Sequence, residues 1–350
     1  MRVLAIETSC DDTAAAVLDD GGVRASIVAS QDMVHGKYGG IVPELASRQH
    51  MVAILPVIQR ALGDAGVGLD DIEGVTATYG PGLVGSLLVG LQVAKGIAFD
   101  RRLPFVGVNH LEGHLLAILL DRPVAFPYLG LLVSGGHTSL YLVEDLGRYR
   151  QLGRTRDDAA GEAFDKGAKM LGLGFPGGKE IDQRAVAGDR TRIRFPRAQL
   201  KSGLYDFSFS GVKTSLRQYL LGGASAALVN GGSAALIDGG AAALADVCAS
   251  FQEAIVDMLI VPTLKAARDL GASSIVVSGG VSANSRLRTA MTETGTAAGF
   301  DVAFPRFAYC TDNAAMIGYA GRARLLRGER HDFTLNAAAT LPIGVDSVER

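Results

Sequence analysis

The sequence predicts a protein made of two related α/β halves. At roughly 150 residues per domain, its 350 residues are enough for two domains. The ranges 4–21 and 131–145 share one layout: a buried strand, a small polar turn that ends in Thr, a second strand and an acidic turn. After each hairpin the chain alternates helical and strand patterns, which is typical of α/β layers.

The elements follow in order along both halves. In the first half, 74–79 and 105–108 read as strands, and 86–99 reads as a helix after a Gly-Pro-Gly turn. In the second half, 274–277 reads as a strand and 285–292 as a helix. The stretch 221–246 is almost entirely Ala, Gly, Leu and Ser, so we expect a surface loop there and assign it no chemistry.

Composition and charge exclude several classes of protein. With 34 Lys and Arg against 36 Asp and Glu, the net charge is −2, which argues against a protein that coats nucleic acid. Hydrophobic residues make up 48% of the chain, which excludes a disordered one. No apolar run approaches the ~18 residues that span a bilayer, the N-terminus lacks a signal-peptide core, and the three cysteines lie far apart. We therefore expect a cytoplasmic protein with no membrane segment.

The sharpest local signal is a pair of histidines directly after a predicted strand. Asn109 is a good N-cap, so His110 and His114 fall at i and i+4 on one helix face, where two imidazoles can reach one metal. Two partly buried structural histidines would give the same pattern. The motif differs from His-Glu-x-x-His because Glu112 stands two residues after His110.

Two histidine ligands need a further partner, and Asp312 offers a carboxylate. The spacing by itself does not connect Asp312 to the histidines. Asp312 and Asn313 precede a predicted helix, so a plain N-cap is the alternative interpretation.

Glycine turns follow three predicted elements. Val-Ser-Gly-Gly occurs at 133–136 and again at 277–280, and Phe-Pro-Gly-Gly occurs at 175–178. Such turns expose backbone N–H groups, which suits a phosphate or a nucleotide, although tight turns also need glycine. The sequence contains no P-loop motif.

Charged residues outside these motifs have two interpretations each. Asp11 and Asp12 in the first hairpin turn would face a phosphate or a metal-bound phosphate, or they are ordinary turn residues. Asp165 could accept hydrogen bonds from a ligand or pair with Lys169. The range 184–201 holds six Lys and Arg against one acid, which fits either a solvated face or a contact with a phosphodiester backbone.

Eight ordered blocks resemble the tRNA N6-adenosine threonylcarbamoyltransferase family, called TsaD in bacteria and formerly named as a glycoprotein endopeptidase. The blocks are IETSCDDT at 6–13, GPGL at 80–83, NHLEGH at 109–114, VSGGHT at 133–138, DDAAGEAFDK at 157–166, FSFSG at 207–211, SGGVSAN at 278–284 and CTDN at 310–313. They run nearly from end to end, and only the Ala/Gly stretch at 221–246 looks longer than the family's pattern.

The resemblance implies an actin/Hsp70/sugar-kinase-like fold of two α/β lobes with the active site in the cleft between them. We expect lobes of 1–122 and 123–350, the second with helical insertions at about 151–270, because Pro123 and Pro127 interrupt helical continuation. The resemblance also implies transfer of a threonylcarbamoyl group from threonylcarbamoyl-AMP to N6 of adenosine 37 in tRNAs that read codons beginning with A, with release of AMP.

The same resemblance implies roles for particular residues. One divalent metal, iron or alternatively zinc, would be held by His110, His114 and Asp312. The residues expected to line the threonylcarbamoyl-adenylate pocket are Val133, Ser134, Gly135, Gly136, His137, Asp165, Gly178, Asp182 and Asn284. We assign proton handling to Asp11 or His137. The expected partners are tRNA, a paralogous TsaB-like subunit and a TsaE-like ATPase.

Three rival functions remain open from the sequence. A sugar or small-molecule kinase would share the fold, but its chemistry gives the His110–His114 pair no role. A metalloendopeptidase needs a general-base Glu beside the first His, and Glu112 is misplaced for that role. A non-catalytic scaffold would keep its function when both histidines are replaced.

Overall fold

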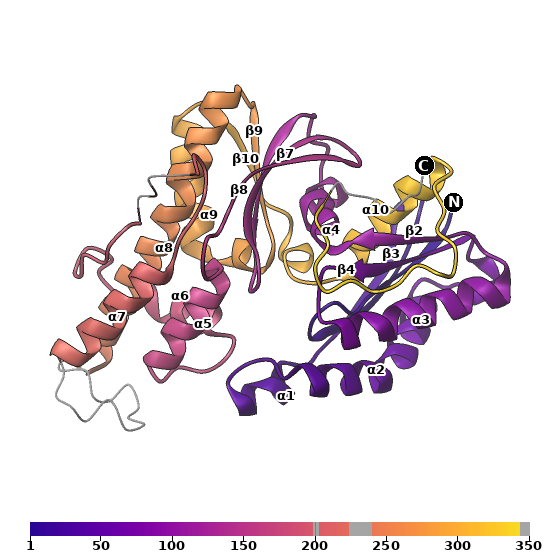
Figure 1. Cartoon of the computed structure of the whole chain (residues 1–350), viewed down its shortest axis with the longest axis horizontal. Helices are drawn as coiled ribbons and strands as arrows, with labels where there is room; N and C mark the ends of the chain where they lie inside the picture. Colours follow the sequence, from indigo (N-terminus) through magenta and orange to yellow (C-terminus); the bar gives the residue numbers. More distant parts are fainter. Residues whose placement is uncertain (199, 201–202, 224–239, 344–350) are drawn as a thin grey trace. The chain divides into compact units, whose positions relative to one another are not determined.

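The computed structural model describes residues 1–198, 200, 203–223 and 240–343, and the chain divides into two compact units (Figure 1). The first unit comprises Met1–Phe126, Glu144–Tyr149 and Pro305–Arg350, and the second comprises Pro127–Val143 and Arg150–Phe304. Each unit is built on one five-stranded mixed sheet.

The first sheet has the strand order β3-β2-β1-β4-β5. Its strands are β1 (Val3–Glu7), β2 (Asp12–Asp19), β3 (Gly22–Ser30), β4 (Gly74–Gly80) and β5 (Phe105–Asn109). The first three form an antiparallel meander, and β4 and β5 continue the sheet parallel to β1. Its helices are α1 (Asp32–His35), α2 (Pro43–Asp64), α3 (Val84–Arg101), α4 (His110–Leu116) and α10 (Ala314–Leu326).

Helices cover both faces of this sheet, which explains why β1 is apolar without alternation from Val3 to Ile6. Leu4 and Ile6 share a core cluster with residues of α2 and α3. Ala5 and Leu18 lie against α10, beside Gly318. Figure 1 shows α10 on one side of the sheet, with α2 and α3 on the other.

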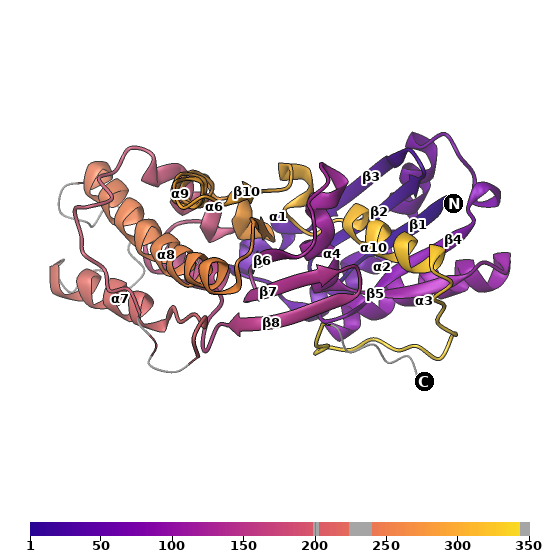
Figure 2. The same cartoon turned by 90° about the horizontal axis from the view of Figure 1, so that it is seen from above.

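The second sheet repeats this plan in the order β10-β9-β6-β7-β8. Its strands are β6 (Tyr128–Val133), β7 (Thr138–Asp145), β8 (Arg148–Arg154), β9 (Ser274–Ser278) and β10 (Asp301–Ala303). Its helices are α5 (Ala160–Met170), α6 (Gly177–Ala185), α7 (Ser210–Gly223), α8 (Gly240–Leu270) and α9 (Ser285–Ala297). Figure 2 shows the long helix α8, which packs against α6 and α9.

The matching strand order of the two sheets confirms the predicted fold class of two related α/β halves. Both predicted hairpins are present, and the predicted helix at 86–99 lies inside α3. The strands β3 and β8 were not predicted, and each hairpin is in fact part of a three-stranded meander. Both of these strands are largely exposed on at least one face and lack an apolar run.

The predicted domain boundary needs a correction. The chain first passes between the units at Phe126, close to the expected boundary at 122, but 305–350 belongs to the first unit and not to the second lobe of 123–350. The reason is packing, because α10 lies on β1, β2, β4 and β5. A helix that packs on a sheet formed by a distant part of the sequence cannot be assigned to a unit from its position in the chain.

The Ala/Gly stretch at 221–246 was expected to be a surface loop. Residues 224–239 lie outside the described residues, whereas 221–223 end α7 and 240–246 begin α8, so the ends of the expected loop are helical. Among the residues that the structure describes, no helix has the length and apolar character to cross a bilayer.

The close packing of α10 on β4 can be tested with a matched pair of glycine variants. A Cβ added at Gly321 would lie 2.5 Å from Cγ2 and 2.6 Å from Cβ of Thr76, so we expect Gly321→Ala to cost about 1–3 kcal/mol of stability. Gly96, exposed in the middle of α3, has no atom within 4 Å of such a Cβ, and Gly96→Ala should gain about 0.5–1 kcal/mol. Denaturant unfolding of both variants measures the difference, and equal stability would contradict this packing.

Candidate functional site

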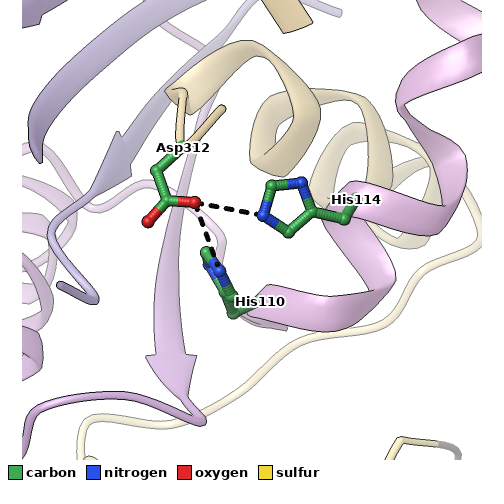
Figure 3. A group of neighbouring side chains, drawn as sticks. All are labelled: His110, His114 and Asp312. Atoms are coloured by element: carbon green, nitrogen blue, oxygen red, sulfur yellow. Dashed lines mark hydrogen bonds and ion pairs between the residues drawn. The ribbon is translucent and has the colours of Figure 1, made fainter. Parts of the chain in front are cut away.

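The structure brings together His110, His114 and Asp312, the three residues expected to bind a metal (Figure 3). The Nε2 atom of His114 lies 3.1 Å from Oδ1 of Asp312, and the Nε2 atom of His110 lies 3.5 Å from the same oxygen. One ligand atom from each residue falls within 4.8 Å of the other two.

Two capped helix starts create this arrangement. The side-chain oxygen of Asn109 accepts a hydrogen bond from the backbone N–H of Leu111, so α4 begins at His110 and the two histidines share a face. At the other helix, Asn313 caps α10 by accepting a hydrogen bond from the backbone N–H of Met316. The N-cap interpretation of the Asp312-Asn313 pair therefore holds for Asn313 but not for Asp312, whose side chain points at the histidines.

The donor set fits a divalent metal ion. Two imidazole nitrogens and one carboxylate oxygen are ligands that iron and zinc accept, and three protein ligands leave further coordination positions open. Burial by itself would lower the pKa of His110, but the negative charges of Asp312 and Glu7 outweigh it and raise the pKa to about 9. Burial lowers the pKa of His114. Asp312 and Glu7 thus place negative charge beside His110, which suits a cation.

Glu7, at the end of β1, is a site residue that was not predicted from the sequence. Its side chain is fully buried, and its Oε2 atom lies 3.1 Å from Nδ1 of His110. Glu7 also accepts hydrogen bonds from the backbone N–H of Ser9 and from the hydroxyl of Thr78. Burial alone would raise the pKa of Glu7, but His110 holds it below its ordinary value. The available signal was a carboxylate that directly follows four apolar residues in the same strand.

Glu112, between the two histidines in sequence, does not face them. Its Oε2 atom lies 3.0 Å from a guanidinium nitrogen of Arg324 on α10, and its Oε1 atom accepts a 2.8 Å hydrogen bond from the hydroxyl of Tyr149. Both Glu112 and Arg324 are buried. Glu112 is thus engaged in an ion pair between two helices, which is not the position of a peptidase general base.

The turn that carries Asp11 and Asp12 is held from two sides. His50, on α2, donates from Nε2 to the carbonyl of Cys10 at 3.0 Å and accepts from the hydroxyl of Thr13 at 2.8 Å. The backbone N–H of Gln31 donates to the carbonyl of Asp11. These contacts hold the turn at the carboxyl end of β1, in the same unit as the candidate metal ligands.

Both aspartates of this turn have perturbed acidity. Burial raises the pKa of Asp11, with a further contribution from the charge of Asp312. Burial, with the charges of Asp312 and Asp11, raises the pKa of Asp12 to about 7. One oxygen of Asp12 is buried without a hydrogen-bond partner in the described residues. Such crowding of like charges is typical of functional sites.

The second unit contains the residues expected to bind the adenylate. Val133 ends β6, and the turn 134–137 is closed by a 2.7 Å hydrogen bond from the N–H of Ser134 to the carbonyl of His137. A Cβ added at Gly135 or Gly136 would meet no atom within 4 Å, and neither has a positive φ. Internal packing and backbone strain therefore do not explain these two glycines.

The remaining predicted residues of this unit lie on neighbouring helices. Asp165, on α5, accepts from the N–H of Gly177 at 2.8 Å. Asp182, on α6 with Gly178, accepts from the backbone N–H and the hydroxyl of Ser285. Asn284 caps α9 and donates to Gln252 at 2.7 Å.

A cavity of about 280 Å³ lies in this unit beside Asp182. It is lined by Asp182, Ala185, Val186, Gly188, Arg190, Ala249, Gln252, Glu253, Ser285, Arg286 and Thr289. The cavity adjoins two of the predicted residues, because Asp182 lines it directly and Asn284 contacts the lining residue Gln252.

Three of the six cations in the basic stretch at 184–201 form ion pairs within their own unit. Arg184 pairs with Glu180, Arg190 with Glu253 and Arg197 with Asp257. Arg192 and Arg194 are exposed, and Lys201 lies outside the described residues. Ion pairing of three arginines favours the interpretation of this stretch as a solvated face over that of a continuous basic surface.

The fold and the histidine–aspartate group define an α/β protein of the actin/Hsp70/sugar-kinase class with a candidate metal centre in its first unit. Solved structures agree on the fold. HypF from T. kodakarensis matches with a TM-score of 0.60 at 13% identity, covering 93% of this chain and 48% of that one. The activator of the 2-hydroxyisocaproyl-CoA dehydratase from Clostridium difficile matches with a TM-score of 0.51 at 14% identity, covering 95% of this chain and 99% of that one.

Sequence comparison identifies the family. The model of the TsaD family, tRNA N6-adenosine threonylcarbamoyltransferase, matches residues 22–319. A protein of that name from Geobacter sp. strain M21 is 51% identical to this chain, and the match covers 98% of this chain and 97% of that protein. Another, from Anaeromyxobacter dehalogenans strain 2CP-1, is 54% identical, and the match covers 96% of this chain and 98% of that protein. The chain belongs to the TsaD family.

The crowding of acids predicts a pH-dependent loss of stability in metal-free protein. Because the folded-state pKa of Asp12 lies above the ordinary 3.8, the folded state keeps a proton that the unfolded state loses, so stability falls as pH rises from about 4 to about 7. We expect Asp12→Asn to raise the unfolding temperature more at pH 8 than at pH 5, in the presence of a chelator. Asp64→Asn, at an exposed residue of α2, is the control. An equal gain at both pH values would contradict the raised pKa.

Proposed function

We propose that this protein transfers the threonylcarbamoyl group from threonylcarbamoyl-AMP to N6 of adenosine 37 in tRNAs that read codons beginning with A, and releases AMP. Family membership over nearly the whole chain supports the reaction. The observation that carries the proposal is the convergence of His110, His114 and Asp312. A kinase of the same fold has no use for this group.

The proposed metal is one divalent ion per chain, iron or alternatively zinc, held by His110, His114 and Asp312. When bound there, such an ion would act as a Lewis acid toward oxygens of the adenylate. The donor set supports either metal and does not discriminate between them.

We further propose that the second unit binds the nucleotide part of the adenylate. Gly135 and Gly136 support this role, because no internal contact requires glycine at either position. Without side chains, the backbone N–H groups of such a turn can approach a phosphate closely. Asp165, Gly178, Asp182 and Asn284 are proposed to complete this binding site, with Asp182 beside the cavity that it lines.

The chemistry requires one proton to move. A bond forms between N6 of adenine and the carbamoyl carbon, the bond from that carbon to the phosphate oxygen breaks, and the amine gives up a proton. Asp11 or His137 is proposed as the acceptor. The raised pKa of Asp11 supports this role, because a carboxylate with a higher pKa is a stronger base.

The proposed partners follow from the family resemblance. They are tRNA as substrate, a paralogous TsaB-like subunit and a TsaE-like ATPase, with a separate enzyme that makes the adenylate. Two rival functions lose support. The engagement of Glu112 with Arg324 argues against a metalloendopeptidase, and the family match argues against a sugar kinase.

The proposal is tested by nucleoside mass spectrometry of bulk tRNA from cells depleted of this protein. We expect N6-threonylcarbamoyladenosine to fall while other modified nucleosides hold their levels. An unchanged level under deep depletion would overturn the proposed reaction.

Complementation then tests the metal centre. We expect His110→Ala and His114→Ala to fail to restore the modified nucleoside, because each removes a proposed ligand. His331→Gln, at a histidine of the same unit outside the candidate metal group, should restore it. Rescue by both alanine variants would favour a scaffold function for these histidines.

A further inference from the structure

The two histidines differ in the partners of Nδ1, the ring nitrogen opposite the candidate metal-binding Nε2. The Nδ1 atom of His110 lies 3.1 Å from Oε2 of Glu7 and 3.1 Å from the hydroxyl oxygen of Ser9. The Nδ1 atom of His114 is buried and has no hydrogen-bond partner among the described residues. Among the described residues, a carboxylate therefore lies beside Nδ1 in His110 but not in His114.

The two groups beside His110 Nδ1, the hydroxyl of Ser9 and the carboxylate of Glu7, differ in which ring nitrogen they allow to carry the proton. A serine hydroxyl can donate or accept, so Ser9 alone would allow the ring proton on either nitrogen. An ionised carboxylate can only accept, so Glu7 requires a hydrogen on Nδ1. In the neutral ring this leaves the lone pair on Nε2, the nitrogen that faces Asp312.

Glu7 is itself held rigidly. Its side chain is fully buried, its Oε1 atom accepts from the N–H of Ser9, and its Oε2 atom also accepts from the hydroxyl of Thr78 on β4. Contacts from the turn after its own strand and from the adjacent strand fix the carboxylate, which in turn fixes the plane of the His110 ring. Carboxylates placed in this way behind a metal-binding histidine strengthen its binding.

We propose that Glu7 is the positioning residue of the candidate metal centre: it accepts the Nδ1–H of His110 and so presents the Nε2 lone pair to the ion. This inference rests on the proposed metal site. It assigns Glu7 no contact with substrate. In Glu7→Gln, the amide can donate to Nδ1, which would move the ring proton to Nε2 and block the ligand atom.

The test measures Zn²⁺ affinity by competition with a chelating dye. We expect Glu7→Gln to weaken Zn²⁺ binding about 10- to 100-fold. Glu112→Gln is the matched control, because it also removes one buried carboxylate charge, and that carboxylate is engaged with Arg324 and Tyr149 rather than with His110. The control should bind Zn²⁺ with an affinity close to that of the wild-type protein.

A spectroscopic measurement separates positioning from a general loss of structure. In the Zn²⁺-loaded wild-type protein labelled with ¹⁵N-histidine, the Nδ1–H proton of His110 should appear at low field, protected from exchange. In Glu7→Gln at saturating Zn²⁺ this signal should be lost or shifted upfield. Circular dichroism of the variant establishes that it is folded.

The outcomes distinguish this inference from the proposed metal site. Wild-type protein that binds neither Zn²⁺ nor Fe²⁺ would overturn both. Wild-type affinity in Glu7→Gln, with a marked loss in His110→Ala, would overturn the role of Glu7 and leave the metal site standing. Equal losses in Glu7→Gln and Glu112→Gln would also overturn it, because the effect would then follow any buried charge.

Discussion

The packing of α10 on α4 and on the first sheet is the constraint on which the candidate metal centre depends. It brings α4, which carries both histidines, against α10, whose preceding residues include Asp312. Gly113, between the two histidines in sequence, lies against Met316 and Ile317 of α10, so the two helices are in close contact there. Because close-packed helices tolerate little displacement, this contact sets the separation between ligands that lie far apart in sequence.

The same unit concentrates negative charge around these ligands. Glu7 and Asp312 lie against His110, and Asp11 and Asp12 occupy the neighbouring turn, which side chains and backbone of the same unit hold in place. Neighbouring carboxylates contribute to the raised pKa values of the two turn aspartates and of His110, since each carboxylate disfavours ionisation of the next and favours a proton on the imidazole. Burial adds to the raised pKa of both aspartates and opposes that of His110. A divalent cation would relieve this excess of charge.

Much of the fold could be predicted from the sequence, and the failures have physical causes. Strands buried on both faces, such as β1 and β6, were found because their apolar runs are unbroken. The exposed strands β3 and β8 were missed because their pairing, rather than their composition, makes them strands. The placement of α10 was predicted wrongly, because its packing on the first sheet is a contact across nearly the whole chain.

The family, the repeated α/β plan and the pairing of His110 with His114 could be read from the sequence, because motifs and helical spacing are local properties of the chain. The family resemblance also named Asp312 as the third candidate ligand, although spacing did not connect it to the histidines. That these three residues converge, that Glu7 lies beside Nδ1 of His110 and that Glu112 pairs with Arg324 became visible only in the folded chain. These contacts depend on how α4, α10 and β1 pack together. Packing of distant segments is decided by the shape of their apolar faces, and no spacing along the chain records it.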